Sequence, residues 1–232
     1  MLDTLGDIIS EITRRLGVST TATYYSSDKI KAAAIQSYMW AVSIYMWPFL
    51  EKAKKTVTVA NQYYYDYPPK LMSDSITRVI VDGVKYEQKN FDDFLNYRDF
   101  TIGVKTRNIF ADFGRQVFLF PTPTENDKEL LIFGFEEVEP LAENEDESIF
   151  TGSESVVNEG IVKKALSILL PSSNRKKEAQ AEEQEAIALL AAVYSKILQR
   201  QGKYQRLDKP MFNVPDMFGP DNSKNVIGNF DL

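Results

Sequence analysis

The run from Asp28 to Lys55, DKIKAAAIQSYMWAVSIYMWPFLEKAKK, constrains the fold more than any other stretch of this chain. At 3.6 residues per turn, its apolar residues do not gather on one face but form three stripes. The stripes are Ile30, Ala34, Tyr38, Ala41 and Tyr45; Ile35, Met39, Val42, Met46 and Phe49; and Trp40, Ile44 and Trp47. The predicted helix is therefore apolar all round, and each of its sides needs a cover.

Three environments could bury the sides of this helix: a membrane, the rest of the same chain, or another subunit. A membrane span needs roughly 20 apolar residues in a row, whereas the dense part of this run is shorter and is interrupted by Ser43 and Pro48. A membrane helix is therefore disfavoured. The helix is either enclosed by its own chain or has one stripe against another subunit, since assembly interfaces also use aromatic surface.

The sequence after Pro48 favours a contact between subunits. Its β-prone character indicates that the chain branches away there, which leaves one stripe of the helix without an evident partner in the same chain. We therefore expect this stripe to lie at or near a subunit boundary. Its members are Tyr38, Trp40, Ile44 and Trp47.

Two absences limit the chemistry. The chain has no cysteine and no histidine, so it lacks disulfides, thiolate nucleophiles, the commonest metal ligand and the commonest general base near neutral pH. Its net charge of −6 argues against tight binding of nucleic acid through phosphates. We expect no catalytic, cofactor-binding or metal site, although a surface past which DNA slides stays compatible with this charge.

Helical patterns occur at both ends of the chain. Leu2 to Gly17 predicts a first helix with Gly17 as its stop, and a polar linker follows. Ser155 to Leu170 and Ser172 to Gly202 predict two closing helices, separated at Pro171. With the central helix they predict a helical bundle.

The middle third changes to a strand-like pattern. Its predicted elements are Thr56–Ala60 and Tyr63–Tyr67 as a hairpin-like pair, Ser75–Val81 joined to Val84–Glu87 by the turn Asp82-Gly83, a short helix Asn90–Arg98, and strands Arg107–Ala111, Gln116–Phe120 and Glu129–Val138. The fold class is therefore α+β, with an antiparallel β module inserted into the bundle. We expect bundle helices in residues 1–55 and 151–202, the β module with an acidic loop in 56–150, and an extended arm in 203–232.

Two acidic clusters and one aromatic cluster admit functional interpretations. The run Glu136–Glu147 lacks the ligand spacing of a calcium loop, and Glu178, Glu182 and Glu185 share a helix face without partner histidines. Solvated surfaces are favoured for both, and a carboxylate-dependent metal enzyme stays the alternative. Four tyrosines, Tyr63, Tyr64, Tyr65 and Tyr67, are not interleaved with basic residues, which favours a sheet face or a subunit contact over base stacking.

The segment Lys203–Leu232 is unlike both a packed element and a solvated tail. It contains three prolines together with regularly spaced apolar residues. We expect an arm that lies along another surface, such as a sheet edge. Its predicted contacts with a neighbouring surface are Met211, Phe212, Val214, Met217, Phe218, Val226, Ile227 and Phe230. A small binding protein that captures a host target with this arm is a further alternative.

The order of these parts resembles the head–tail adaptor (connector) proteins of tailed bacteriophages, which include the tail tubular A type. The resemblance spans roughly residues 1 to 200. It rests on an N-terminal helix pair and two closing helices around the stretches WPFL (47–50), TVTVANQYYYDYPPKL (56–71) with its Tyr-x-x-Pro, SITRVIVDGVKY (75–86), FLFPTP (118–123) and EVEPL (137–141).

The resemblance implies a non-enzymatic virion structural protein of the head–tail neck, made in the host cytoplasm, without a cofactor and without a membrane contact. It implies a homo-oligomeric ring, commonly of twelve subunits, between the portal protein and a tail or neck protein. Double-stranded DNA would pass through its channel without sequence-specific binding. The implied contacts are arm to portal, helix to helix around the ring, and β module to tail-side partners.

Overall fold

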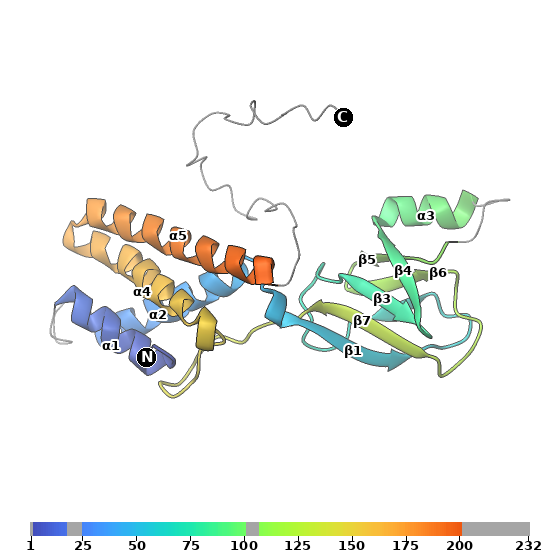
Figure 1. The fold of residues 1–232 in the computed structure, drawn as a ribbon, viewed down its shortest axis with the longest axis horizontal. Coiled ribbons are helices and arrows are strands. Elements are labelled where there is room, and N and C mark those ends of the chain that lie inside the picture. Colours follow the sequence, from blue (N-terminus) through green and yellow to red (C-terminus); the bar gives the residue numbers. More distant parts are fainter. Residues whose placement is uncertain (1, 18–24, 101–106, 201–232) are drawn as a thin grey trace, which may run out of the picture.

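The structure, a computed structural model, describes residues 2–17, 25–100 and 107–200 (Figure 1). Within these residues the fold is α+β: a helical bundle lies at one end of the molecule and a sheet with one helix at the other. The chain passes from bundle to sheet before the first strand and returns after the last one. The sheet is therefore inserted into the bundle, as the sequence predicted.

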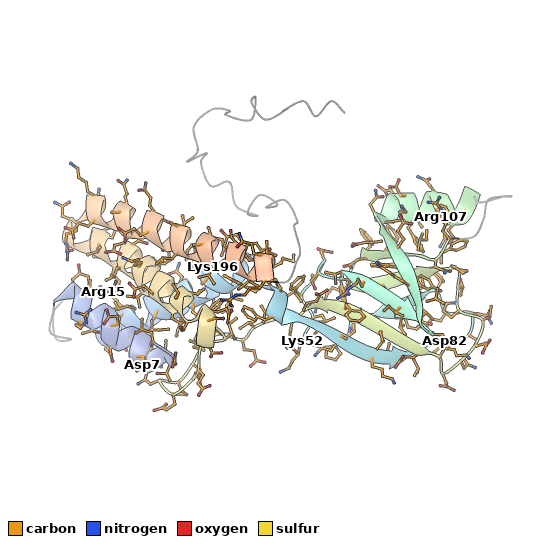
Figure 2. All side chains as sticks on the ribbon, viewed as in Figure 1. Asp7, Arg15, Lys52, Asp82, Arg107 and Lys196 are labelled. Carbon is orange, nitrogen blue, oxygen red and sulfur yellow. The ribbon has the colours of Figure 1, made fainter. Side chains whose placement is uncertain are left out.

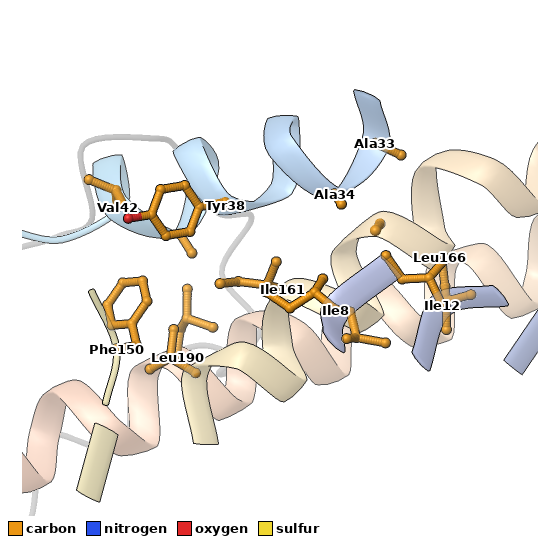
Figure 3. Close-up of a cluster of buried hydrophobic side chains, with 14 of the residues drawn as sticks. Ile8, Ile12, Ala33, Ala34, Tyr38, Val42, Phe150, Ile161, Leu166 and Leu190 are labelled. Carbon is orange, nitrogen blue, oxygen red and sulfur yellow. The ribbon is translucent and has the colours of Figure 1, made fainter. Parts of the chain in front are cut away.

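The bundle contains the helices α1 (Leu5–Leu16), α2 (Ser27–Ser43), α4 (Val156–Leu169) and α5 (Lys176–Arg200), with short 3-10 turns η2 (Gly152–Glu154) and η3 (Leu170–Ser173) beside α4. Thr4 and Asp7 form a capping box at the start of α1, and Gly17 ends it in the left-handed conformation with φ 65°. Figure 3 shows side chains from the four helices meeting in one core. Helices were predicted correctly at both ends of the chain.

Gly160 permits the close crossing of α4 and α5. A Cβ at this position would clash with the Cδ1 atom of Leu190, which is itself fully buried. A larger residue would therefore force the helices apart or displace Leu190 from its place in the core.

The central helix is shorter than predicted. α2 ends at Ser43, the chain turns through η1 (Pro48–Leu50), and Glu51 begins a strand. The sequence predicted a kink or an end at Pro48 and grouped the residues up to Lys55 with the bundle helices, but residues 51–55 belong to a strand. Pro48 cannot donate the bond that would continue the helix, and the residues after it gain hydrogen bonds from another strand instead.

The sheet contains seven strands in the described residues. They are β1 (Glu51–Val57), β2 (Tyr64–Asp66), β3 (Arg78–Val81), β4 (Val84–Lys89), β5 (Ile109–Phe113), β6 (Gln116–Phe120) and β7 (Glu129–Phe135). Their order is β1-β7-β3-β4-β5-β6-β2, and neighbours are antiparallel except for the parallel pair β4 and β5. The β3–β4 hairpin forms at Asp82 and Gly83, whose φ angles of 48° and 77° suit a tight turn.

The predicted hairpin of 56–60 with 63–67 is wrong. β1 pairs with β7 and β2 pairs with β6, so the two segments lie at opposite ends of the strand order. The sheet nevertheless curls, and the Tyr65 hydroxyl of β2 accepts a hydrogen bond from the Val59 N–H, just beyond β1, at 3.1 Å. Long-range pairing with β7 and β6 replaced the local pairing that the sequence indicated.

The sheet has a core of its own. Its inner face buries Tyr65, Tyr86, Phe110 and other apolar residues from the curled strands. Helix α3 (Phe91–Phe100) covers the outer face of β5 and β6 with Phe94, against Ile109 and Ala111. None of the helices in the described ranges combines the length and the apolar character needed to cross a bilayer.

Candidate assembly surfaces

The stripe predicted to meet another subunit is largely enclosed by its own chain. Tyr38 is 1% exposed, Ile44 4% and Trp47 0%. The expectation that this stripe lacks an intrachain partner is wrong for these three side chains, which belong to the core of the bundle.

Phe150 and Tyr194 supply the cover that the sequence did not reveal. The Phe150 ring meets Trp47 at 5.0 Å and Tyr38 at 6.4 Å between centroids, both edge to face. Figure 3 shows Phe150 beside Tyr38 in the bundle core. Tyr194 of α5 meets the Trp47 ring at 5.7 Å, and the Trp47 Nε1–H donates to the Ala41 carbonyl at 2.9 Å. Phe150 precedes a predicted helix in a loop, where periodicity gives no signal.

Trp40 differs from the rest of the stripe, because it is half-buried. The ammonium group of Lys164 lies 5.1 Å from the centre of its ring, and Lys164 also pairs with Glu183. This is a cation–π contact between α2 and α4 at the surface of the bundle. A role for Trp40 at a subunit boundary stays a prediction.

The predicted arm contacts lie outside the described residues. All of them fall in 211–230, whereas the last described residue is Arg200. They stay a prediction.

The acidic clusters are engaged in ion pairs and turns. Lys54 bonds Glu136 at 2.9 Å, and the main-chain N–H groups of Ala142 and Glu143 donate to Asp146 at 2.7 and 2.9 Å. On α5, Lys163 bridges Glu182 and Glu185 at 3.2 and 2.7 Å. Within residues 2–17, 25–100 and 107–200, no group of three or more acidic side chains is arranged to hold a metal ion.

An aromatic surface on the β domain, which comprises the sheet and α3, combines two of the tyrosines noted in the sequence with three phenylalanines that the sequence did not assign to a surface. It consists of Tyr63, Tyr64, Phe91, Phe113 and Phe118, and we call it the distal aromatic surface. Phe91 stacks on Phe113 at 4.4 Å and meets Phe118 at 5.0 Å, and both tyrosine rings lie within 6.4 Å of Phe118. Tyr63, Tyr64 and Phe113 are 37%, 43% and 55% exposed. Exposed aromatic rings in one patch are typical of protein interfaces.

The neighbouring charges distinguish this surface from a nucleic-acid platform. Arg98 lies over the Tyr63 ring at 5.6 Å, but it also bonds Asp99 at 2.8 Å. Helix α3 adds Asp92 and Asp93 in its first turn. Base-stacking platforms combine aromatic rings with a basic groove, so this arrangement favours a protein partner. Of the tyrosines interpreted as a sheet face or a subunit contact, Tyr65 points into the core.

A hollow of about 480 Å³ lies between the bundle and the sheet. Its walls come from Phe49 and Lys52 on one side and from Ile149, Ile197 and Arg200 on the other. Figure 2 shows Lys52 at this junction, near the end of α5. The described chain therefore ends next to the start of β1.

A comparison with known protein families identifies the family to which this chain belongs. A family model described as SU10 adaptor protein matches residues 3–210, which include every described element. The chain belongs to this family. No curated protein matches the chain.

Membership of the SU10 adaptor protein family identifies a bacteriophage adaptor, a structural protein of the virion. It agrees with the coarser part of the resemblance seen in the sequence. The match ends at Pro210, so all the predicted arm contacts lie beyond it.

Proposed function

We propose that this SU10 adaptor protein forms the ring that joins the portal to the tail, in the manner of head–tail connectors of the tail tubular A type, and that the genome passes through its channel. The observation that carries this proposal is the family match over residues 3–210. An adaptor has to present separate surfaces to different neighbours, and the division of this chain into a bundle and a sheet with its own core is consistent with that need.

Each body has a role in the proposed ring. The bundle helices meet those of adjacent subunits, with Trp40 at or near that contact. The distal aromatic surface faces the tail-side or neck partner, because its exposed rings lie on the β domain, away from the bundle. The arm in 203–232 reaches the portal or another neighbour through its apolar residues.

Native mass spectrometry of the purified protein, alone and mixed with portal rings, tests the ring. We expect a single high-order oligomer, or one that forms when portal is added, and electron microscopy should show a central channel. A protein that stays monomeric in both mixtures and ignores portal would contradict the proposal.

Removal of the arm separates docking from folding. A chain truncated after Gly202 should still fold and unfold cooperatively, because residues of the described ranges already form the bundle core and the sheet core, but it should no longer bind portal. Replacing Phe212 and Phe218 by Ser should reproduce the loss, whereas replacing Asn213 and Asn222 should not. Unchanged portal affinity of the truncated chain would disprove the role of the arm.

A further inference from the structure

The sheet has one long open edge, the outer side of β1. This strand has seven residues, pairs with β7 on one side, and stands last in the strand order. Most of its residues are exposed. An edge of this length presents unpaired main-chain groups to which another extended segment can add.

The register identifies the unpaired groups. At the two ends of the β1–β7 ladder, the Glu136 N–H donates to the Leu50 carbonyl and the Thr58 N–H donates to the Lys128 carbonyl, each at 2.9 Å. Bonded positions alternate along an antiparallel pair, so even-numbered residues of β1 face β7. The main-chain groups of Ala53, Lys55 and Val57 therefore point to the open side, and they have no hydrogen-bond partner within the described ranges.

The opposite edge of the sheet is protected. β2 has three residues, and the Gln62 side-chain amide donates to the Tyr64 carbonyl at 2.7 Å, which occupies an edge acceptor. Pro68 and Pro69 follow shortly after and cannot donate to a further strand. The edge of β1 is therefore the better acceptor for an added strand.

A second copy of β1 does not suit this edge. β1 carries Lys52, Lys54 and Lys55, and two-fold pairing of two such strands would bring these lysines together. Like charges across a strand pair are destabilising, and lysines on an edge strand are a known guard against such pairing. A suitable occupant is an extended segment with apolar and acidic residues.

The chain itself carries such a segment, and its last described residues lie beside the start of this edge. Ile197 and Arg200 at the end of α5 share the junction hollow with Phe49 and Lys52, so the chain continues from a point beside the start of β1. Residues 221–232, DNSKNVIGNFDL, lie outside the described residues. They contain no proline, include the β-prone Val226, Ile227 and Phe230, and have Asp221 and Asp231 near either end.

The intervening sequence has sufficient reach. The 20 residues 201–220 contain Pro210, Pro215 and Pro220, which disfavour strand pairing there. Fully extended, they span up to about 70 Å. The seven residues of β1 span about 24 Å. Residues 221–232 can therefore lie along the whole edge in either direction.

We propose that residues 221–232 add a strand to the open edge of β1 in the same chain when the subunit is not assembled. A segment tethered by a short linker has an effective concentration of the order of millimolar, which exceeds that of a second molecule in dilute solution. The added strand covers the edge against pairing with other proteins. The release of this strand rests on the proposed function: docking of the arm to the portal withdraws it, so that the edge is exposed only on assembly.

Amide hydrogen exchange of the isolated full-length protein tests the added strand without portal. The N–H groups of Ala53, Lys55 and Val57 should exchange roughly tenfold or more slowly than in a chain truncated after Gly202. The double variant Val226→Pro and Ile227→Pro should exchange like the truncated chain, and Asn213→Pro like the full-length protein. Equal exchange in the full-length and truncated chains would overturn the proposal.

Cysteine cross-linking identifies the molecule that supplies the strand. The chain has no native cysteine, so Lys55→Cys combined in turn with Asn225→Cys, Ile227→Cys or Asn229→Cys gives a clean background. Under mild oxidation we expect cross-linked monomers, and far fewer with Lys85→Cys on β4 as the control. A ladder of cross-linked oligomers, or cross-linking as efficient with the control, would contradict pairing in the same chain. Both experiments use the unassembled protein, so their failure leaves the proposed ring untouched.

Discussion

Asn158 shows how a single polar residue organises the bundle. It is fully buried, yet its side-chain amide donates to the carbonyls of Leu2 and Phe150 at 2.6 and 2.9 Å and its oxygen accepts from Ser148 at 2.7 Å. These bonds tie the N-terminus and the loop before α4 to one helix. They hold Phe150 where it covers Trp47, so one satisfied polar group positions an aromatic core.

Asn158→Leu should be strongly destabilising, because it removes the partner of two buried groups, the Phe150 carbonyl and the Ser148 hydroxyl, and the donor to the Leu2 carbonyl. We expect a loss of about 3 kcal/mol in the free energy of unfolding. Urea denaturation followed by circular dichroism measures it, and Gln180→Leu on the exposed face of α5 is the control, with a change within about 0.5 kcal/mol. Similar losses in both variants would contradict this role of Asn158.

Asp112 is a half-buried polar residue whose hydrogen bonds, unlike those of Asn158, do not fully offset the cost of its burial. Burial raises the pKa of its carboxyl group, and the charge of nearby Asp74 adds to the rise. Hydrogen bonds from Tyr67 and from the Ile76 N–H lower this pKa but do not cancel the rise. Its Oδ1 atom is buried without a partner among the described residues. Because the folded pKa exceeds the unfolded one, the stabilisation by the protonated form is present below the unfolded pKa and is lost as the pH rises through the folded pKa.

Asp112→Asn should therefore raise the Tm at pH 7 and have a smaller effect at pH 4, because the raised pKa leaves a larger share of the native carboxyl protonated there than at pH 7. Thermal unfolding across this pH range measures the difference. The exposed Asp66→Asn serves as control and should show no such trend. An equal change in Tm at both pH values would show that the charge of Asp112 does not cost stability.

At the scale of elements, α2 separates two tryptophans that the sequence placed on one stripe. The helix ends at Ser43, so Trp40 stays on its surface while Trp47 follows a turn and enters the core. A helical projection assumes that the helix continues. Because Pro48 and the pairing of β1 with β7 end it early, the projection misplaced Trp47.

The two tryptophans should respond differently to truncation. Trp47→Ala should cost about 3 to 5 kcal/mol of stability, since it empties a buried site and removes the bond to Ala41. Trp40→Ala should cost about 1 kcal/mol, because it removes a half-buried cation–π contact, but should weaken assembly. Denaturation and native mass spectrometry measure the two effects. A Trp40→Ala protein that assembles normally would exclude this residue from the subunit boundary.

At the scale of the whole molecule, the two bodies have separate apolar cores. The bundle core and the sheet core share no residue. Leu50 and Phe135, which lie at the junction, belong to the bundle core. An adaptor that meets different partners at its two ends gains from this separation, because each body can present its own surface.

The β domain should therefore fold without the bundle. A fragment of residues 50–137 should show dispersed amide resonances and cooperative unfolding, since its sheet core is complete within it. The expected cost is a lower Tm, because Leu50 and Phe135 lose their cover. A fragment without cooperative unfolding would show that the bundle is needed for the sheet to form.

The sequence by itself determined the features that depend on neighbouring residues. Helix α1 with its stop at Gly17, the hairpin at Asp82-Gly83, strand β6 and the two closing helices were all evident, because stops, turns and periodicity act over a few residues. The α+β class and the adaptor family followed from their order. Local physics was sufficient for these elements.

The tertiary structure alone decided which segments cover one another. It moved β1 from a predicted helix and hairpin to the edge of the sheet, because β7, more than seventy residues later, offers it a full ladder. It enclosed Trp47 through a loop residue, Phe150, whose position follows from the bonds of Asn158. Such contacts join residues far apart in the chain, and no local pattern records which distant partner satisfies an apolar stripe or an open strand.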